Sequence, residues 1–94
     1  MGQAVVVKNI VILGDMLLID TDRSFTGQDG HVVTRDDPGQ GVPGFLGERV
    51  FSLDAGVDYL HVLQNQVSVR RPGGWDDTTV GTVTRAVQDF LLFY

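Results

Sequence analysis

Two apolar segments separated by Gly14-Asp15 open the chain. Residues 4–13 read AVVVKNIVIL, and residues 16–20 read MLLID. β-Branched residues favour strands, and glycine supplies the positive φ that a two-residue hairpin turn needs. The pattern therefore predicts a β-hairpin with strands at 4–13 and 16–21.

This hairpin carries apolar side chains on both of its faces. Pairing the strands across the turn gives one face with Val5, Val7, Val11, Leu13, Met16 and Leu18, and another with Val6, Ile10, Ile12, Leu17 and Ile19. An antiparallel sheet with one face in water normally alternates apolar and polar residues. We therefore expect both faces of the hairpin to be covered.

The middle of the chain alternates apolar and polar segments. Residues 20–30 are polar and turn-rich, and residues 31–35 predict a short strand. Residues 36–48 contain two prolines and four glycines, which predicts a long irregular loop. A strand is expected at 49–53 and a turn at 54–56.

Residues 57–71 alternate with the period of a strand. The alternation places Val57, Tyr59, His61, Leu63, Val67 and Val69 on one face. Either one long strand or a hairpin bent at Asn65-Gln66 satisfies this pattern, and Pro72-Gly73-Gly74 ends it.

The last segment changes to a helical period. Apolar residues recur at positions 80, 83, 87, 90, 91 and 94. Asp76, Asp77 and Thr78 are candidate N-caps, and acidic residues there complement the helix dipole. We predict a helix over 79–92, with a strand over 79–84 as the alternative.

These elements predict a single α+β domain spanning residues 1–94. Its expected architecture is a mostly antiparallel sheet of five to six strands with one C-terminal helix packed on one face. The sheet could also curl into a partial barrel. Because one helix covers only one face, either that curling or a second copy of the chain must cover the other.

Composition and charge exclude several classes of function. The chain has no cysteine, which excludes disulfides and thiolate metal sites and favours a cytoplasmic location. Its formal net charge is −5 and it has no basic stripe, which argues against binding nucleic acid or anionic membrane. Lys8-Asn9 interrupts the first apolar segment, so no signal peptide or membrane span is expected there. A soluble, acidic protein is the expectation.

The sequence contains few residues that indicate chemistry. Asp20, Asp22, Ser24 and Asp29 resemble the start of a calcium loop, but Phe25 and His31 stand where such a loop needs glycine and an acid. No further ligand accompanies His31 or His61. We therefore predict no metal site, no cofactor and no catalytic residues.

Binding residues are expected in two places. The segment RRPGGW offers Arg70, Arg71 and Trp75, residue types common in binding hot spots, although the sequence favours a structural strand-to-helix connection anchored by Trp75. Tyr59, His61, Trp75 and Phe90 would line a pocket between the sheet and the C-terminal helix.

The sequence thus favours a non-enzymatic interaction or structural module that works as a small homo-oligomer, as in an accessory, virion or mobile-element protein. Self-association, or a protein partner, would use an interface of Ile10, Ile12, Leu17 and Ile19. The alternative is a small-molecule-binding domain or small enzyme with the pocket described above. An acidic inhibitor is a third hypothesis, but the modest charge argues against it.

Overall fold

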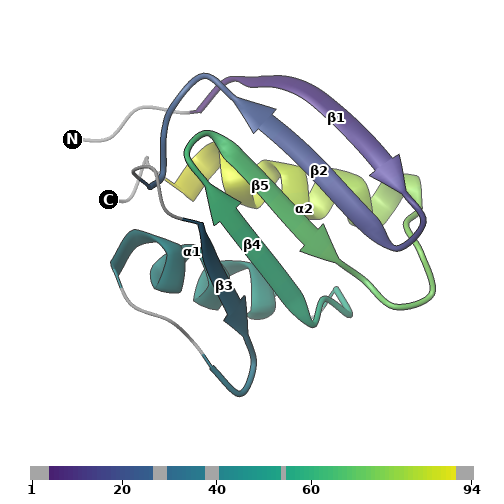
Figure 1. Ribbon diagram of the computed structural model, residues 1–94. Coiled ribbons are helices and arrows are strands. Elements are labelled where there is room, and N and C mark those ends of the chain that lie inside the picture. The colour runs from purple at the N-terminus through teal and green to yellow at the C-terminus, as the bar shows by residue number, and fades with distance from the viewer. Residues whose placement is uncertain (1–4, 27–29, 38–40, 54, 91–94) are drawn as a thin grey trace.

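The computed structural model describes residues 5–26, 30–37, 41–53 and 55–90 (Figure 1). The strands are β1 (Val7–Leu13), β2 (Met16–Thr21), β3 (His31–Thr34), β4 (Tyr59–Leu63) and β5 (Gln66–Arg70), and the helices are α1 (Gly41–Phe51) and α2 (Asp77–Asp89). The predicted α+β class with an antiparallel sheet is confirmed, but two helices are present where one was expected.

The five strands form one open sheet in the order β1-β2-β5-β4-β3, and every neighbouring pair is antiparallel. β1 and β3 are the two edges, so the sheet does not close into a barrel. Both helices lie on the same face of the sheet (Figure 1). This face is called the helix face below, and the opposite one is called the open face.

The β1–β2 hairpin follows the sequence closely. Gly14 has φ 62° in the two-residue turn, and β2 spans the predicted residues. β1 begins only at Val7, and the register shifts between Val7 and Asn9. Beyond that bulge, Ile10 pairs with Ile19 and Ile12 with Leu17. For residues 10–19 the pairing confirms the predicted division of side chains between two faces. Before the bulge the prediction was wrong: Val5 is buried in the core and Val7 packs against it, whereas Val6 is 57% exposed.

Helix α1 corrects the prediction for residues 36–53. Gly41–Phe51 forms a helix, so the loop predicted for 36–48 and the strand predicted for 49–53 were wrong there. Residues 38–40 lie outside the described part. Proline fits the first turn of a helix, where its missing N–H is not needed, and Pro43 occupies that turn. Gly44 and Gly47 are buried, and a Cβ at Gly47 would overlap the side chain of Val33 in β3. Gly47 therefore allows close packing of α1 on β3, whereas the sequence suggested an irregular loop.

The segment 57–71 forms a hairpin rather than one long strand, but its turn is Gln64-Asn65 and not the predicted Asn65-Gln66. Leu63 pairs with Gln66 across a two-residue turn, in which Gln64 has φ 53°. The turn changes which residues share a face. Tyr59, His61 and Leu63 point to the open face, whereas Val67 and Val69, like Val57, are fully buried on the helix face. The single apolar face predicted for this segment is therefore wrong.

Helix α2 confirms the predicted C-terminal helix and excludes the strand over 79–84. Asp76 is the N-cap: its carboxylate accepts a hydrogen bond from the Thr79 amide, and the Thr79 hydroxyl accepts one from the Asp76 amide. This reciprocal pair satisfies two donors at the helix start. Residues 91–92, which the prediction included, lie outside the described part.

The core lies between the sheet and the two helices. Its fully buried side chains come from β2, β4 and β5 on one side and from α1 and α2 on the other: Leu17, Ile19, Leu60, Val62, Val67, Val69, Leu46, Val50, Val83 and Val87. Because all of them face the helices, neither α1 nor α2 covers the open face of the sheet.

Candidate functional site

The open face of the sheet carries exposed apolar side chains on both of its edge strands, namely Val11, Leu13 and Val32. The strand registers align its residues in two rows across the sheet. One row is Val11, Leu18, Ser68, His61 and Val32, and the other is Leu13, Met16, Arg70, Tyr59 and Thr34. The apolar members concentrate on β1 and β2, while β5 contributes polar ones.

Four side chains at the β1–β2 end of these rows form an apolar stripe: Val11, Leu13, Met16 and Leu18. Leu13 is 61% exposed and Val11 39% exposed, and Met16 and Leu18 are partly exposed. Contiguous exposed apolar side chains mark interaction surfaces more often than isolated ones do. The sequence places these four on one face but does not reveal which of the two faces the helices cover.

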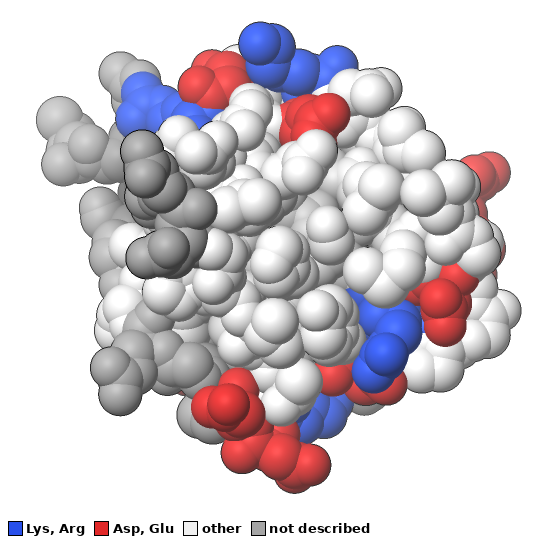
Figure 2. All heavy atoms as spheres, in the orientation of Figure 1, with Lys and Arg blue, Asp and Glu red and all other residues white. Residues whose placement is uncertain are grey.

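Charged side chains avoid the middle of this face. Figure 2, in the orientation of Figure 1, shows a broad area without Lys, Arg, Asp or Glu atoms, with charged groups toward its margins. Depletion of charge in the centre and a polar rim are typical of protein interfaces. The charge distribution therefore agrees with a protein-binding surface.

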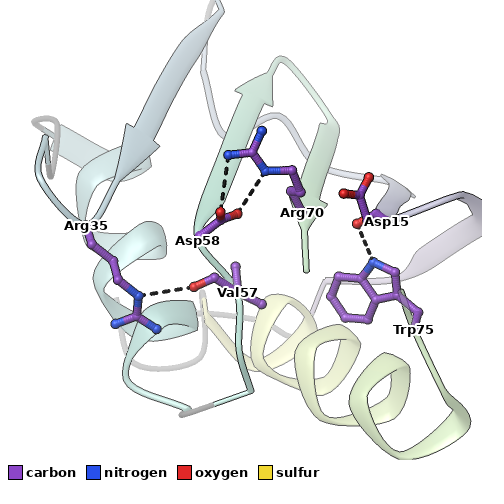
Figure 3. A network of polar contacts seen from close by, with 6 residues as sticks. All are labelled: Asp15, Arg35, Val57, Asp58, Arg70 and Trp75. Atoms are coloured by element: carbon purple, nitrogen blue, oxygen red, sulfur yellow. Dashed lines mark hydrogen bonds and ion pairs between the residues drawn. The ribbon is translucent and has the colours of Figure 1, made fainter. Parts of the chain in front are cut away.

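Arg70 is on the open face, but its charge is paired. Its Nε donates to Asp58 Oδ1 at 2.9 Å and its Nη2 to Asp58 Oδ2 at 3.3 Å (Figure 3). Its guanidinium also stacks on the Tyr59 ring, 5.0 Å from the centroid. The hydrogen bond that Arg70 donates to the Asp58 carboxylate raises the pKa of Arg70 above its usual value. Arg70 and Tyr59 thus form a preassembled polar border to the apolar stripe.

His61 lies in the row that contains Val11 and Leu18, and its ring is half-buried. Gly30 leaves room for it, since a Cβ on Gly30 would come within 2.6 Å of His61 Nε2. Neighbouring groups in its row are the Ser68 hydroxyl and the Val32 side chain. His61 is therefore a surface residue of the sheet in apolar and neutral surroundings.

Arg71 and Trp75 hold the connection between β5 and α2 in place. The Arg71 amide donates to the Asp15 carbonyl at 2.9 Å. Trp75 Nε1 donates to the same carbonyl at 2.8 Å (Figure 3). Arg71 also donates to the carbonyl oxygens of Ala55 and Gly74. These bonds tie the β1–β2 turn to the start of α2, which agrees with the structural explanation of RRPGGW.

The six predicted binding residues do not form one site. Tyr59, His61 and Arg70 share the open face, and Arg71 and Trp75 belong to the β5–α2 connection. Phe90 is 4% exposed and packs in the core against Phe25, with ring centroids 6.3 Å apart. The space between the sheet and α2 is filled by buried side chains, so the predicted pocket is not found there.

An open groove of about 540 Å³ lies between α1 and α2. Arg49 and Arg85 line it together with Asp77 and Asp89, and Gly81 forms part of its floor. Because both charge signs are present, the groove has no clear preference for an anion or a cation.

The predicted interface is corrected in part. Leu17 and Ile19 are fully buried in the chain's own core, so neither is accessible to a partner. Ile10 and Ile12 are 38% and 48% exposed, because β1 is an edge strand that the helices cover incompletely. The accessible apolar side chains of this hairpin are therefore those of β1 and those of β2 that point to the open face.

The acidic segment after β2 has a structural role at one position. Asp22 Oδ1 accepts a hydrogen bond from the Val6 amide at 2.9 Å, and Asp29 lies outside the described residues. Within the described ranges, no group of three or more His, Asp or Glu side chains could hold a metal ion.

Comparison with known proteins supports the fold alone. No known protein-family model matches the chain, and no curated protein sequence matches it. Its structure is similar to the crystal structure of protein SAV1430 from Staphylococcus aureus, with a TM-score of 0.60 and 18% identity. That similarity covers 88% of this chain and 94% of the other.

None of the described helices is long and apolar enough to cross a membrane.

Proposed function

We propose that this chain is a non-enzymatic interaction module that works as a small homo-oligomer and uses the apolar stripe as part of its contact surface. The observation that carries the proposal is the exposure of Val11 and Leu13 on a sheet face that neither helix covers. Burial of such side chains is favourable by about 25 cal/mol per Å².

The arrangement of charge supports a protein partner over a charged ligand. Arg70, the arginine beside the stripe, is already paired with Asp58, and the rest of the central area lacks charged atoms (Figure 2). A second copy offers a surface of the same chemistry, and self-complementary contacts are the commonest route to homo-oligomers. The lack of cysteine in the sequence agrees with action in the cytoplasm.

The proposal is tested by the mass of the protein in solution, measured by light scattering over a range of concentrations. We expect a mass above the 10.3 kDa of one chain. Leu13→Lys should shift it toward the monomer, because an ammonium group would have to lose its water in the contact. Phe45→Lys is the matched control: Phe45 is 50% exposed on α1, away from the open face. A single 10.3 kDa species at every concentration would exclude the oligomer.

The small-molecule alternative would have to use the groove between α1 and α2, whose volume of about 540 Å³ suits a ligand. A thermal-shift screen over metabolites separates the two functions. A compound that stabilises the wild type but not Gly81→Leu, which would fill the floor of the groove, would favour the alternative.

A further inference from the structure

Strand β1 is an edge of the sheet with apolar side chains exposed on both of its faces. Ile10 and Ile12 are 38% and 48% exposed on the helix face, and Val11 and Leu13 are 39% and 61% exposed on the open face. Long apolar edge strands readily pair with another strand, and most proteins protect them. β1 is thus an available site for strand addition.

The opposite edge of the sheet is protected in ways that β1 is not. β3 has only four residues, and the exposed charged residues Arg35, Asp36 and Asp37 follow it directly. On β1, comparable protection is limited to its first residues, where Lys8 and the register shift between Val7 and Asn9 interrupt the edge. The stretch from Ile10 to Leu13 has neither charge nor bulge.

The backbone of this stretch is oriented for pairing. In a hairpin with a two-residue turn, the residues next to the turn are a hydrogen-bonded pair, and bonded and non-bonded pairs then alternate. Leu13 with Met16 and Val11 with Leu18 are therefore the bonded pairs of the β1–β2 ladder. The amides and carbonyls of Ile10 and Ile12 consequently point outward, away from β2.

We infer that two copies of this chain pair antiparallel through β1 about a twofold axis at Val11, so that their sheets join into one. This inference rests on the proposed self-association and specifies its geometry. Ile10 of each copy lies opposite Ile12 of the other, and the outward amides and carbonyls of these residues form the ladder. Pairing stops at the dimer, because each copy uses the same edge and neither has a second β1 edge to offer.

Charge and size of the facing side chains select this register. An axis at Val11 places isoleucines opposite isoleucines on the helix face and Lys8 opposite Gly14, next to Asp15 of the second copy. An axis at Ile10 would instead place Lys8 opposite Ile12, and an axis at Ile12 would leave Ile10 facing Gly14. If the register shifted by one residue, the outward amides and carbonyls of Ile10 and Ile12 would face residues whose own backbone groups are already bonded to β2.

The joined sheet also brings the apolar stripes of the two copies together. A twofold axis perpendicular to the sheet keeps the two open faces on the same side, so the stripes of the two copies become neighbours at the junction. One strand per copy is a small contact, near or below the roughly 1,000 Å² of a stable interface. We therefore expect a dimer that dissociates on dilution.

Residue-resolved amide exchange of the wild-type chain, measured by NMR at low and high concentration, tests the geometry directly. When nine-tenths of the chains are paired, hydrogen exchange at the amides of Ile10 and Ile12 should slow about tenfold. Exchange then occurs only in the one-tenth of the chains that are monomeric. The amides of Val11 and Leu13, bonded to β2, serve as internal controls and should change little.

A proline variant gives an independent test. Ile12→Pro removes an outward N–H that the β1–β2 ladder does not use, and proline is tolerated at such positions of edge strands. It should abolish the dimer, while Ile12→Thr, which keeps the N–H and a β-branched side chain, should retain most of it. Circular dichroism of both variants checks that the fold is intact.

The outcomes separate this inference from the proposed function. A dimer in which the Ile10 and Ile12 amides exchange as fast as in the monomer would overturn strand pairing but leave self-association standing. A monomer at all concentrations would overturn both. Protection of these amides only after addition of another protein would replace the second copy with a different strand and also overturn the inference.

Discussion

Two helical glycines illustrate how local surroundings determine the role of a residue. A Cβ at Gly47 in α1 would overlap the Val33 side chain in β3, whereas a Cβ at Gly81 in α2 would meet no atom within 4 Å. Alanine is favoured over glycine in a helix by about 1 kcal/mol. The sequence places Gly47 in a predicted loop, and only the structure reveals that it is a helical residue needed for packing against β3.

We predict opposite effects on stability for alanine at these two positions. Gly81→Ala should raise the free energy of unfolding by about 0.5–1 kcal/mol, since only the backbone effect applies. Gly47→Ala should lower it by about 1–2 kcal/mol, because overpacking against a β-branched side chain outweighs the helix gain. Urea denaturation of both variants measures the difference. Stabilisation of Gly47→Ala would show that α1 is not held closely against β3.

At the scale of elements, the sequence predicts those whose period and end residues agree. The β1–β2 hairpin is rich in β-branched residues and has Gly14 in its turn, and α2 has apolar residues at helical spacing with Asp76 as its N-cap. α1 could not be predicted, because its glycines and proline resemble a loop until the packing against β3 is known. The faces of β4 and β5 depend on where the turn lies, and a one-residue error there exchanges the two faces.

The cap of α2 should make stability depend on pH. Hydrogen bonds from the Thr79 amide and side chain lower the pKa of Asp76 below 3.8. A lowered carboxyl pKa contributes stability that is present above the unfolded pKa and is lost as the pH falls through the folded one. Asp76→Asn keeps a capping oxygen but does not titrate. The stability advantage of the wild type over Asp76→Asn at neutral pH should therefore shrink below about pH 4.

Chemical denaturation of both proteins between pH 2.5 and 7 measures this difference. The remaining carboxyl groups titrate in both proteins, so their contributions cancel in the comparison. A wild-type advantage that stays constant across the range would contradict the assigned role of the Asp76 charge.

At the scale of the whole molecule, the two helices and the sheet form two layers, with the core between them and one broad face left open (Figure 1). The sequence suggests this imbalance, since the first hairpin is apolar in both directions. It could not identify the accessible residues, because Leu17 and Ile19 are as apolar as Val11 and Leu13 and differ only in facing the helices. The position of the helices decides which face of the hairpin is buried and which stays accessible.

Self-association through β1 and the apolar stripe should make the melting temperature depend on protein concentration. Binding that occurs only in the folded state stabilises it by mass action, by about 1.4 kcal/mol at ten times the dissociation constant. For a domain of this size, 1 kcal/mol corresponds to about 4–8 °C. The wild type should therefore melt several degrees higher when its concentration is raised from well below to well above the dissociation constant.

Leu13→Lys should melt at the same temperature at every concentration, and Phe45→Lys should behave like the wild type. A wild-type melting temperature that is constant over a thousandfold range would mean that the open face and the β1 edge remain in contact with water in the working form of the protein.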